Sequence, residues 1–357
     1  MNTLSAVFQV DSRVSRIGSP STSYQLCRFL LFEGPMELNL GIAADRRSLA
    51  QSMKLDFDNK CDEYLKDERR THIGASDIGD KCSRKVWFKF RHVLDEKPGN
   101  QNHTPGQMRR LWKRGHKEEI TLIEYLEMAG HAFLPRPIGE DGKPKQHRIE
   151  KFALGHGGGS CDELGYPPLQ FWPFRDKPWL YEFKTIKQKY FTKLQKEGVA
   201  RCEYTASHFD QMNMYGPEFG CDFCLYLCVN KDDDDIHWEV VCLNPAIRDE
   251  LKMKAHDIVT SQIPPHKFSG TKTNMYCKNL CSFIDICHHG EQVEKNCRSC
   301  ASARAVQNGV WHCDRWGKPI PPEGIPIGCD AYKSIMDCKS CGGSGCPDCA
   351  MTGRIVS

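Results

Sequence analysis

The chain has 357 residues, with 49 basic and 46 acidic side chains, a net charge of +3 and 39% hydrophobic residues. This is the balance of a globular protein, and it excludes wholesale disorder. No apolar run reaches the ~18 residues of a membrane span. The most apolar segment near the start, residues 26–32, is a poor signal-peptide core because Cys27 and Arg28 interrupt it. We therefore expect an intracellular, cytoplasmic protein that does not bind membranes, in which any nucleic-acid surface is local.

The pattern of apolar residues predicts one large core. Residues 1–35 contain Ser, Pro and Gly clusters without a sustained period, and we expect a disordered extension there. Helical spacing predicts helices at residues 42–68, 76–90 (with Ser76 as N-cap), 106–129, 188–197, 205–216 and 245–261. Strand-like segments lie at residues 159–166, 179–186, 223–229 and 236–243.

This order of elements predicts an α/β fold with helices flanking a central sheet. The expected divisions are the extension 1–35, a core over 36–275, a thiol-rich segment 276–292, a metal-binding module 293–335 and a four-cysteine knuckle or ribbon 336–357. In the helix 106–129, His116 is four residues from both Trp112 and Ile120, which predicts that it faces inward.

Two acids and a lysine are spaced as a hydrolytic metal site requires. Asp162 follows a glycine-rich run at the start of one strand, and Glu182 and Lys184 are two residues apart on the next, so both leave the sheet on one face. Carboxylates suit Mg²⁺ or Mn²⁺, and a lysine can position water and stabilise developing charge. A solvated strand face is the alternative explanation. Gln211 and Tyr215 project from one face of a later helix, where a polar pair is costly to bury without partners.

These motifs, in this order, resemble the PD-(D/E)XK nuclease superfamily, and its RecB-like branch in particular, which includes CRISPR-associated exonucleases and phage exonucleases. The motifs are Cys82-Ser-Arg-Lys85, Gly115-His116-x-x-Glu119, Gly159-Ser-x-Asp162, Glu182-Phe-Lys184 and Gln211-x-x-x-Tyr215. The segments His72-Ile-Gly-Ala-Ser-Asp-Ile-Gly79 and Arg114-Gly-His-Lys-Glu118 resemble the phage versions, and the match spans residues 70–290. The usual Pro-Asp of the acid motif is replaced by Cys161-Asp162.

The resemblance implies a restriction-endonuclease-like core and a role for each motif residue. His116, Asp162 and Glu182 would bind Mg²⁺ or Mn²⁺, Lys184 would assist the attacking water, and Gln211 with Tyr215 would position DNA. The reaction would be hydrolysis of DNA ends or single strands by a phage-encoded exonuclease acting in recombination or processing. Residue chemistry alone leaves a structure-selective endonuclease open, as well as a non-catalytic module that binds DNA or protein through its zinc sites.

Cysteine is concentrated at the end of the chain, where 11 of the 20 follow residue 276. A reducing compartment makes close pairs of thiols metal ligands. One four-thiolate zinc set is Cys338, Cys341, Cys346 and Cys349. A looser set is Cys297, Cys300, Cys313 and Cys329, for which His312 competes as a ligand. These zinc modules could also bind a protein partner.

Three further thiols, Cys277, Cys281 and Cys287, lack a fourth ligand, which His288 or His289 could supply in a zinc site. Iron–sulfur members of the RecB-like branch place one cysteine before the nuclease motifs and three after them. This resemblance implies that Cys82 completes a [4Fe–4S] site, and we favour that cluster over zinc. Basic residues flank the motifs on two expected helices, where they could be solvated or bind phosphates. They are Arg109, Arg110, Lys113, Arg114, Lys187, Lys189, Lys193 and Lys196.

Overall fold

The computed structural model describes residues 36–65, 69–94, 104–337, 340 and 347. The chain divides into two compact units, residues 1–60 and 61–357. The expected helix at 42–68 is confirmed as α2, Met36–Tyr64, which begins six residues earlier. None of the described helices is both long and apolar enough to span a membrane. The extension at 1–35 and the four cysteines of the expected knuckle lie outside the described residues.

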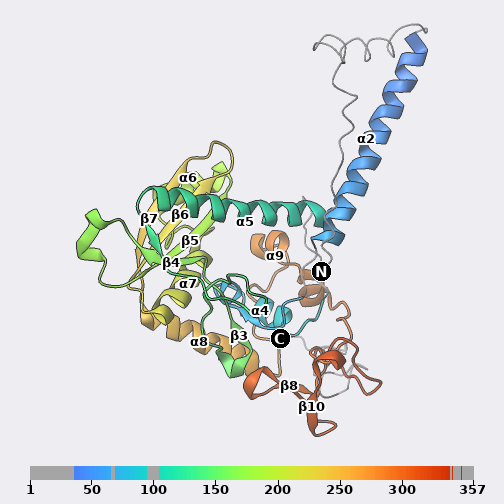
Figure 1. Cartoon of the computed structure of the whole chain (residues 1–357). Coiled ribbons are helices and arrows are strands. Elements are labelled where there is room, and N and C mark those ends of the chain that lie inside the picture. The colour runs from blue at the N-terminus through green and yellow to red at the C-terminus, as the bar shows by residue number, and fades with distance from the viewer. Residues whose placement is uncertain (1–35, 66–68, 95–103, 338–339, 341–346, 348–357) are drawn as a thin grey trace, which may run out of the picture. The chain divides into compact units, whose positions relative to one another are not determined.

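A five-stranded mixed sheet forms the centre of the unit 61–357, which confirms the α/β class (Figure 1). The strands, in sheet order, are β2 Ala132–Phe133, β4 Glu163–Tyr166, β5 Trp179–Ile186, β6 Phe223–Asn230 and β7 Ile236–Cys242. Strands β5 and β6 are parallel, and the other neighbours are antiparallel. The parallel pair is formed because the connection from β5 to β6 is long enough for two helices.

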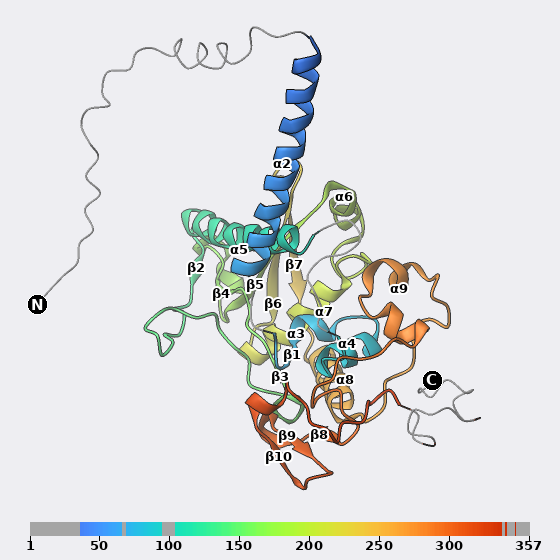
Figure 2. The same ribbon diagram turned by 90° about the vertical axis from the view of Figure 1, so that its right-hand side faces the viewer.

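Helices lie on both faces of this sheet (Figures 1 and 2). The helices of this unit are α3 Ala75–Ile78, α4 Ser83–Phe90, α5 Pro105–Met128, α6 Gln188–Glu197, α7 Ala206–Tyr215, α8 Pro245–Thr260 and α9 Met275–Leu280, of which α5, α6 and α7 contact the central strands. Short strands are β1 Ile73–Gly74, β3 Gly157–Gly158, β8 Ala303–Ala305, β9 Trp311–Cys313 and β10 Lys318–Ile320. Single helical turns are η1 Ala153–Gly155, η2 Leu169–Phe174, η3 Gly216–Phe219, η4 Asp285–His289, η5 Gln307–Gly309 and η6 Pro322–Gly324.

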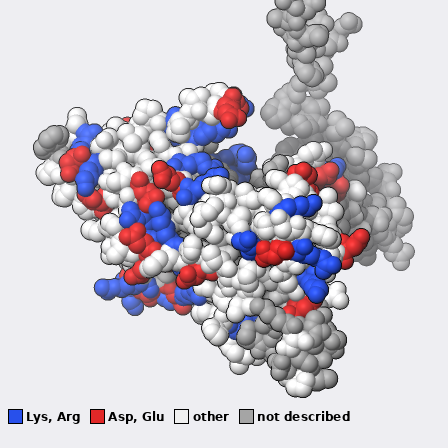
Figure 3. Space-filling model, turned by 90° about the horizontal axis from the view of Figure 1, so that it is seen from below, with Lys and Arg blue, Asp and Glu red and all other residues white. Residues whose placement is uncertain are grey.

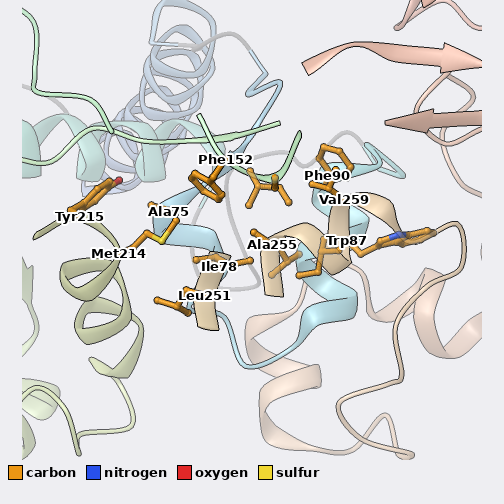
Figure 4. Packing of buried hydrophobic residues seen from close by; sticks show 14 of the residues in the cluster. Ala75, Ile78, Trp87, Phe90, Phe152, Met214, Tyr215, Leu251, Ala255 and Val259 are labelled. Carbon is orange, nitrogen blue, oxygen red and sulfur yellow. The ribbon is translucent and has the colours of Figure 1, made fainter. Parts of the chain in front are cut away.

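Alternation along β5 assigns its side chains to two different apolar clusters. Tyr181 and Phe183 pack with Leu122 and Leu126 of α5 on one face. Leu180 belongs to the larger cluster on the opposite face. In Figure 4 this larger cluster runs from Tyr215 and Met214 through Ala75 and Ile78 to Trp87. The site residues Glu182 and Lys184 share the face of Leu180, because they differ from it by two and four positions.

The expected helix at 76–90 is wrong in one respect, since two helices occupy this segment. Helix α3 ends at Ile78, and α4 begins after Cys82, whose thiol accepts a hydrogen bond from the backbone N–H of Lys85. The turn between them passes close to α7, because a Cβ on Gly79 would lie 2.9 Å from the Cβ of Asp210. Ser76 therefore lies inside α3 and is not an N-cap.

The strands β8–β10 are attached to the core through two buried arginines and Trp311. The guanidinium groups of Arg91 and Arg298 lie 5.0 Å and 4.9 Å from the centre of the Trp311 ring. Arg91 donates to the carbonyl of Ala303, and Arg298 donates to that of Thr71. Burial lowers the pKa of each arginine to about 9. Carbonyl oxygens and ring faces thus compensate these buried charges.

Charges of both signs are interspersed on the face of the molecule seen from below (Figure 3). This agrees with the small net charge of +3. That face carries no broad region of one charge sign. A positively charged binding surface would therefore be a local group of side chains.

Candidate active site

Asp162, Glu182 and Lys184 lie together at the point where the pairing of β4 with β5 ends. Pairing of the two strands ends at Glu163 and Tyr181, so Asp162 stands opposite Glu182. The backbone N–H of Phe183 donates to Asp162 Oδ2 at 2.9 Å. Lys184 Nζ lies 3.8 Å from the same oxygen and donates to Glu182 Oε1. The structure thus places both acids and the lysine within reach of one another.

Glu182 is a buried carboxylate with one oxygen left unpaired. Its side chain is 0% exposed, and Oε2 has no hydrogen-bond partner among the described residues. Burial, followed by repulsion from Asp162, raises the pKa of Glu182 to about 8 despite the neighbouring ammonium of Lys184. A solvated strand face is therefore excluded for this residue, and the unpaired oxygen is a costly feature that a cation would relieve.

Lys184 is held in its charged form by the two acids. Burial alone would lower the pKa of this lysine, but the charges of Glu182 and then Asp162 outweigh burial and raise the pKa above its usual value. The side chain is 23% exposed, so the ammonium can still meet a molecule that enters from solvent. Lys184 is thus a fixed positive charge beside Asp162 and Glu182.

A third carboxylate, Glu119 of α5, belongs to this group and was not among the site residues predicted from the sequence. Burial raises the pKa of Glu119, and the negative charge of Asp162 raises it further, so the two acids interact electrostatically. The signal in the sequence was its spacing, since Glu119 is three residues after His116 and three before the buried Leu122. Acids on α5, directly before β4 and on β5 therefore converge.

The expected inward position of His116 is wrong. Its side chain is 70% exposed, and Trp112 and Ile120 are 44% and 58% exposed. The buried apolar residues of this part of α5 are Leu122 and Leu126, so Glu119 lies nearer the inward face of the helix. His116 is about 60° from Glu119 around the helix axis. His116 Nδ1 remains 3.4 Å from Glu119 Oε1. It thus adjoins the acids through Glu119.

Gln211 and Tyr215 are both buried on α7, at 8% and 3% exposure. A Cβ on Gly159 would lie 2.5 Å from Tyr215 Oη, so only glycine leaves room for this hydroxyl beside the backbone that leads to Asp162. Burial and then the charge of Glu182 raise the pKa of Tyr215.

Helix α7 also carries a histidine that the sequence did not single out. The pKa of His208 is lowered to about 3 by burial and then by the charge of Lys184.

The chemistry of these donors suits a hard divalent cation. Among the residues described, no three His, Cys, Asp or Glu side chains are close enough to hold one ion as they stand. Lys184 lies between Asp162 and Glu182 and neutralises them in this arrangement. The unpaired Glu182 Oε2 and the adjacent carboxylate of Asp162 are the oxygens that could take up Mg²⁺ or Mn²⁺.

Four cysteines from distant parts of the chain line one small cavity. Cys82, Cys277, Cys281 and Cys287 surround it, together with the basic side chains of Arg84 and Lys85. The pKa of Cys287 is raised by burial, and the nearby thiols Cys82 and Cys277 also raise it. His288 lines the same cavity, whereas His289 Nδ1 pairs with Asp285 at 2.9 Å.

The looser cysteine set is also gathered in space. The pKa of Cys297 is raised by burial and then by Cys329, Cys300 and Cys313, so each of these three thiols is near enough to Cys297 to affect its charge. The competing ligand His312 places its Nδ1 3.2 Å from Asp314 Oδ1.

No protein-family model matches this chain, and no curated protein does. Among solved structures, SSO0001 is 15% identical, and the match covers 68% of this chain and 98% of that one with a TM-score of 0.37. An alkaline exonuclease, LHK-Exo from Laribacter hongkongensis, is 13% identical over 55% of this chain and 90% of its own, with a TM-score of 0.35. LHK-Exo in complex with dAMP is 14% identical over 53% and 87%, with a TM-score of 0.33. The function has to be argued from the site.

Proposed function

We propose that the protein is a Mg²⁺- or Mn²⁺-dependent deoxyribonuclease of the RecB-like PD-(D/E)XK type. The observation that carries this proposal is the buried carboxylate of Glu182, whose Oε2 has no partner among the described residues although Asp162 and Lys184 adjoin it. An unpaired buried carboxylate is expensive for stability alone, whereas it is useful where a cation and a phosphate must meet.

The chain's own residues supply positioning and charge. Asp162 is fixed by the N–H of Phe183, so its carboxylate is oriented before substrate arrives. Asp162 and Glu182 would hold the cation, with His116 and Glu119 at the adjoining side. Lys184, charged at neutral pH, would orient the attacking water and stabilise the negative charge that develops on the phosphate. A bound divalent ion would polarise the phosphodiester and lower the pKa of the water.

The substrate and mode of cleavage follow from the sequence resemblance. We take the substrate to be DNA, entered from an end or as a single strand, with Gln211 and Tyr215 positioning it. The biological setting would be recombination or processing of DNA by a phage-encoded enzyme in the cytoplasm of its host. An exonuclease degrades linear strands and spares circular single strands, whereas a structure-selective endonuclease cuts both.

The test is degradation of an end-labelled oligonucleotide with Mg²⁺ or Mn²⁺. Lys184→Ala is expected to lose at least ~100-fold in rate, the usual contribution of a group that assists proton transfer or stabilises charge. Lys143→Ala, an exposed lysine on a loop, is the matched control and should cleave as the wild type does. Equal activity of Lys184→Ala and the wild type would refute the proposal and favour a binding module.

We further propose that Cys82, Cys277, Cys281 and Cys287 hold a [4Fe–4S] cluster. Support comes from the four thiols, which come from distant parts of the chain and line one cavity. The resemblance to iron–sulfur members of the RecB-like branch favours a cluster over zinc. Arg84 and Lys85 would offset the negative charge of a thiolate-ligated cluster.

Such a cluster would join residue 82 to residues 277–287 and so close a long loop of the nuclease core. Protein purified without oxygen is expected to be brown and to contain about four irons, and Cys82→Ala should be colourless. Colourless wild-type protein that contains only zinc would overturn this assignment.

We propose that the other two cysteine sets bind zinc, which elemental analysis would measure. These sets are Cys297, Cys300, Cys313 and Cys329, and Cys338, Cys341, Cys346 and Cys349. These modules would provide the surface for a protein partner.

A further inference from the structure

Three positively charged side chains from separate elements meet beside the candidate active site. Arg114 lies on α5, Lys187 directly follows β5, and Lys231 directly follows β6. The ends of the two strands are held together by their register, Ile186 opposite Asn230, and by a hydrogen bond from the N–H of Lys231 to the carbonyl of Ile186. The charges of Arg114 and Lys187 both reach Lys231 and, after burial, lower its pKa.

Among the described residues, these three cations lack acidic partners. In the described part of the chain, no carboxylate lies within ion-pair distance of Arg114, Lys187 or Lys231, although many other lysines and arginines are paired. The carboxylate of Asp232 lies close by, but it accepts the N–H of Gln188 and forms no ion pair with the three cations. Like charges that converge without ion-paired counterions repel one another, so their grouping favours an anionic ligand.

The position of the cluster relates it to the catalytic residues. Lys187 directly follows β5 and is three residues beyond Lys184, about 10 Å along an extended chain. Arg114 is five residues before Glu119 on α5, about 7.5 Å along the helix axis. A B-form strand rises about 3.4 Å per nucleotide, so a phosphate at the cluster would lie a few nucleotides from the one being cleaved.

We infer that Arg114, Lys187 and Lys231 form a binding site for internal backbone phosphates of the substrate DNA strand, a few nucleotides from the cleaved bond. Arg114 and Lys187 are exposed and Lys231 is half-buried, so the cluster is open to a strand that passes along the surface. Contacts of this kind hold the strand without reading its sequence. The inference rests on the proposed nuclease function, because it names how that site holds its substrate.

The test measures binding separately from cleavage. Anisotropy of a fluorescent single-stranded oligonucleotide is recorded in Ca²⁺ across a range of NaCl concentrations, so that affinity is obtained without Mg²⁺ or Mn²⁺. The triple variant Arg114→Gln/Lys187→Gln/Lys231→Gln is compared with Lys143→Gln/Lys151→Gln/Lys318→Gln, which removes the same charge from exposed lysines elsewhere. Thermal melting of both variants verifies that they are folded.

The expected result is a slope of log affinity against log salt that is shallower by about 2 for the cluster variant, since each single-strand phosphate contributes about 0.7. The control slope should be unchanged, and 5′-phosphorylated and 5′-hydroxyl strands should lose affinity equally. Equal slopes for the two variants would overturn the inference, as would a loss confined to 5′-phosphorylated strands. Cluster-dependent binding without cleavage in Mg²⁺ or Mn²⁺ would refute the nuclease function and leave the phosphate site standing.

Discussion

Replacing Glu182 by glutamine should remove a pH-dependent cost from the folded state. The folded pKa of this acid is raised to about 8 from a reference value of 4.5. Between these values the folded state binds more protons than the unfolded state, so the free energy of unfolding falls as pH rises. Glutamine keeps the shape of the side chain and cannot ionise.

The magnitude is clearest between pH 7 and pH 8. Over this unit the raised pKa predicts that the wild type loses about 1 kcal/mol relative to Glu182→Gln. The buried His92 and His208, whose pKa values are lowered to about 3, contribute little here because their unfolded-state pKa is near 6.5. Glu119 has a raised pKa and is present in both proteins.

The assay is urea denaturation of both proteins at pH 7 and pH 8 in EDTA. The wild type should lose stability over this range, and Glu182→Gln should lose about 1 kcal/mol less. Adding Mg²⁺ at pH 8 should stabilise the wild type more than the variant, because a cation bound by ionised Glu182 favours the folded state. Parallel pH profiles with no difference in the Mg²⁺ response would refute the reasoning.

Three other outcomes are expected. Trp311→Ala should lower the free energy of unfolding by about 3–5 kcal/mol in urea titrations, as for other buried aromatic residues. A loss below ~1 kcal/mol would show that this ring does not hold the strands β8–β10 to the core. In Glu182→Gln, which lacks the opposing titration of Glu182, stability should fall from pH 6.5 to pH 5, because His92 and His208 stay neutral when folded and protonate when unfolded, each contributing at most about 1.4 kcal/mol per unit; a flat profile of this variant would contradict this. Gly159→Ala should displace Tyr215 and slow cleavage at least ~10-fold in the oligonucleotide assay, since its Cβ would lie 2.5 Å from the hydroxyl; an unchanged rate would mean that the position of Tyr215 does not matter.

Elements with a strong local pattern were predictable from the sequence. The bounds of β5 and α6 match the predicted segments because alternation and helical spacing are clear there and turn residues border them. The same alternation placed Glu182 and Lys184 on one face of the sheet. Trp87 and Phe90, within the predicted helical segment 76–90, are buried.

Features that depend on packing were not predictable. The apolar residues of α5 are spread around much of the helix, so the sequence could not show that Leu122 and Leu126 face the sheet while Trp112 is exposed. That ambiguity placed His116 inward and left Glu119, although part of the quoted motif, out of the predicted site residues. The turn at Gly79 divides a segment whose helical pattern seemed continuous, because the close approach of α7 is a tertiary effect.

The most direct test of the central claim is Mn²⁺ binding, followed by the electron paramagnetic resonance signal of the free ion. Wild-type protein at pH 8 is expected to take up Mn²⁺, and Asp162→Asn and Glu182→Gln should each lose at least ~10-fold in affinity, as for removal of a ligand or its support. The control Asp141→Asn, an exposed acid that pairs with Lys145, should bind as the wild type does. Uptake that is the same in all four proteins would contradict the account, because the ion would then be bound elsewhere.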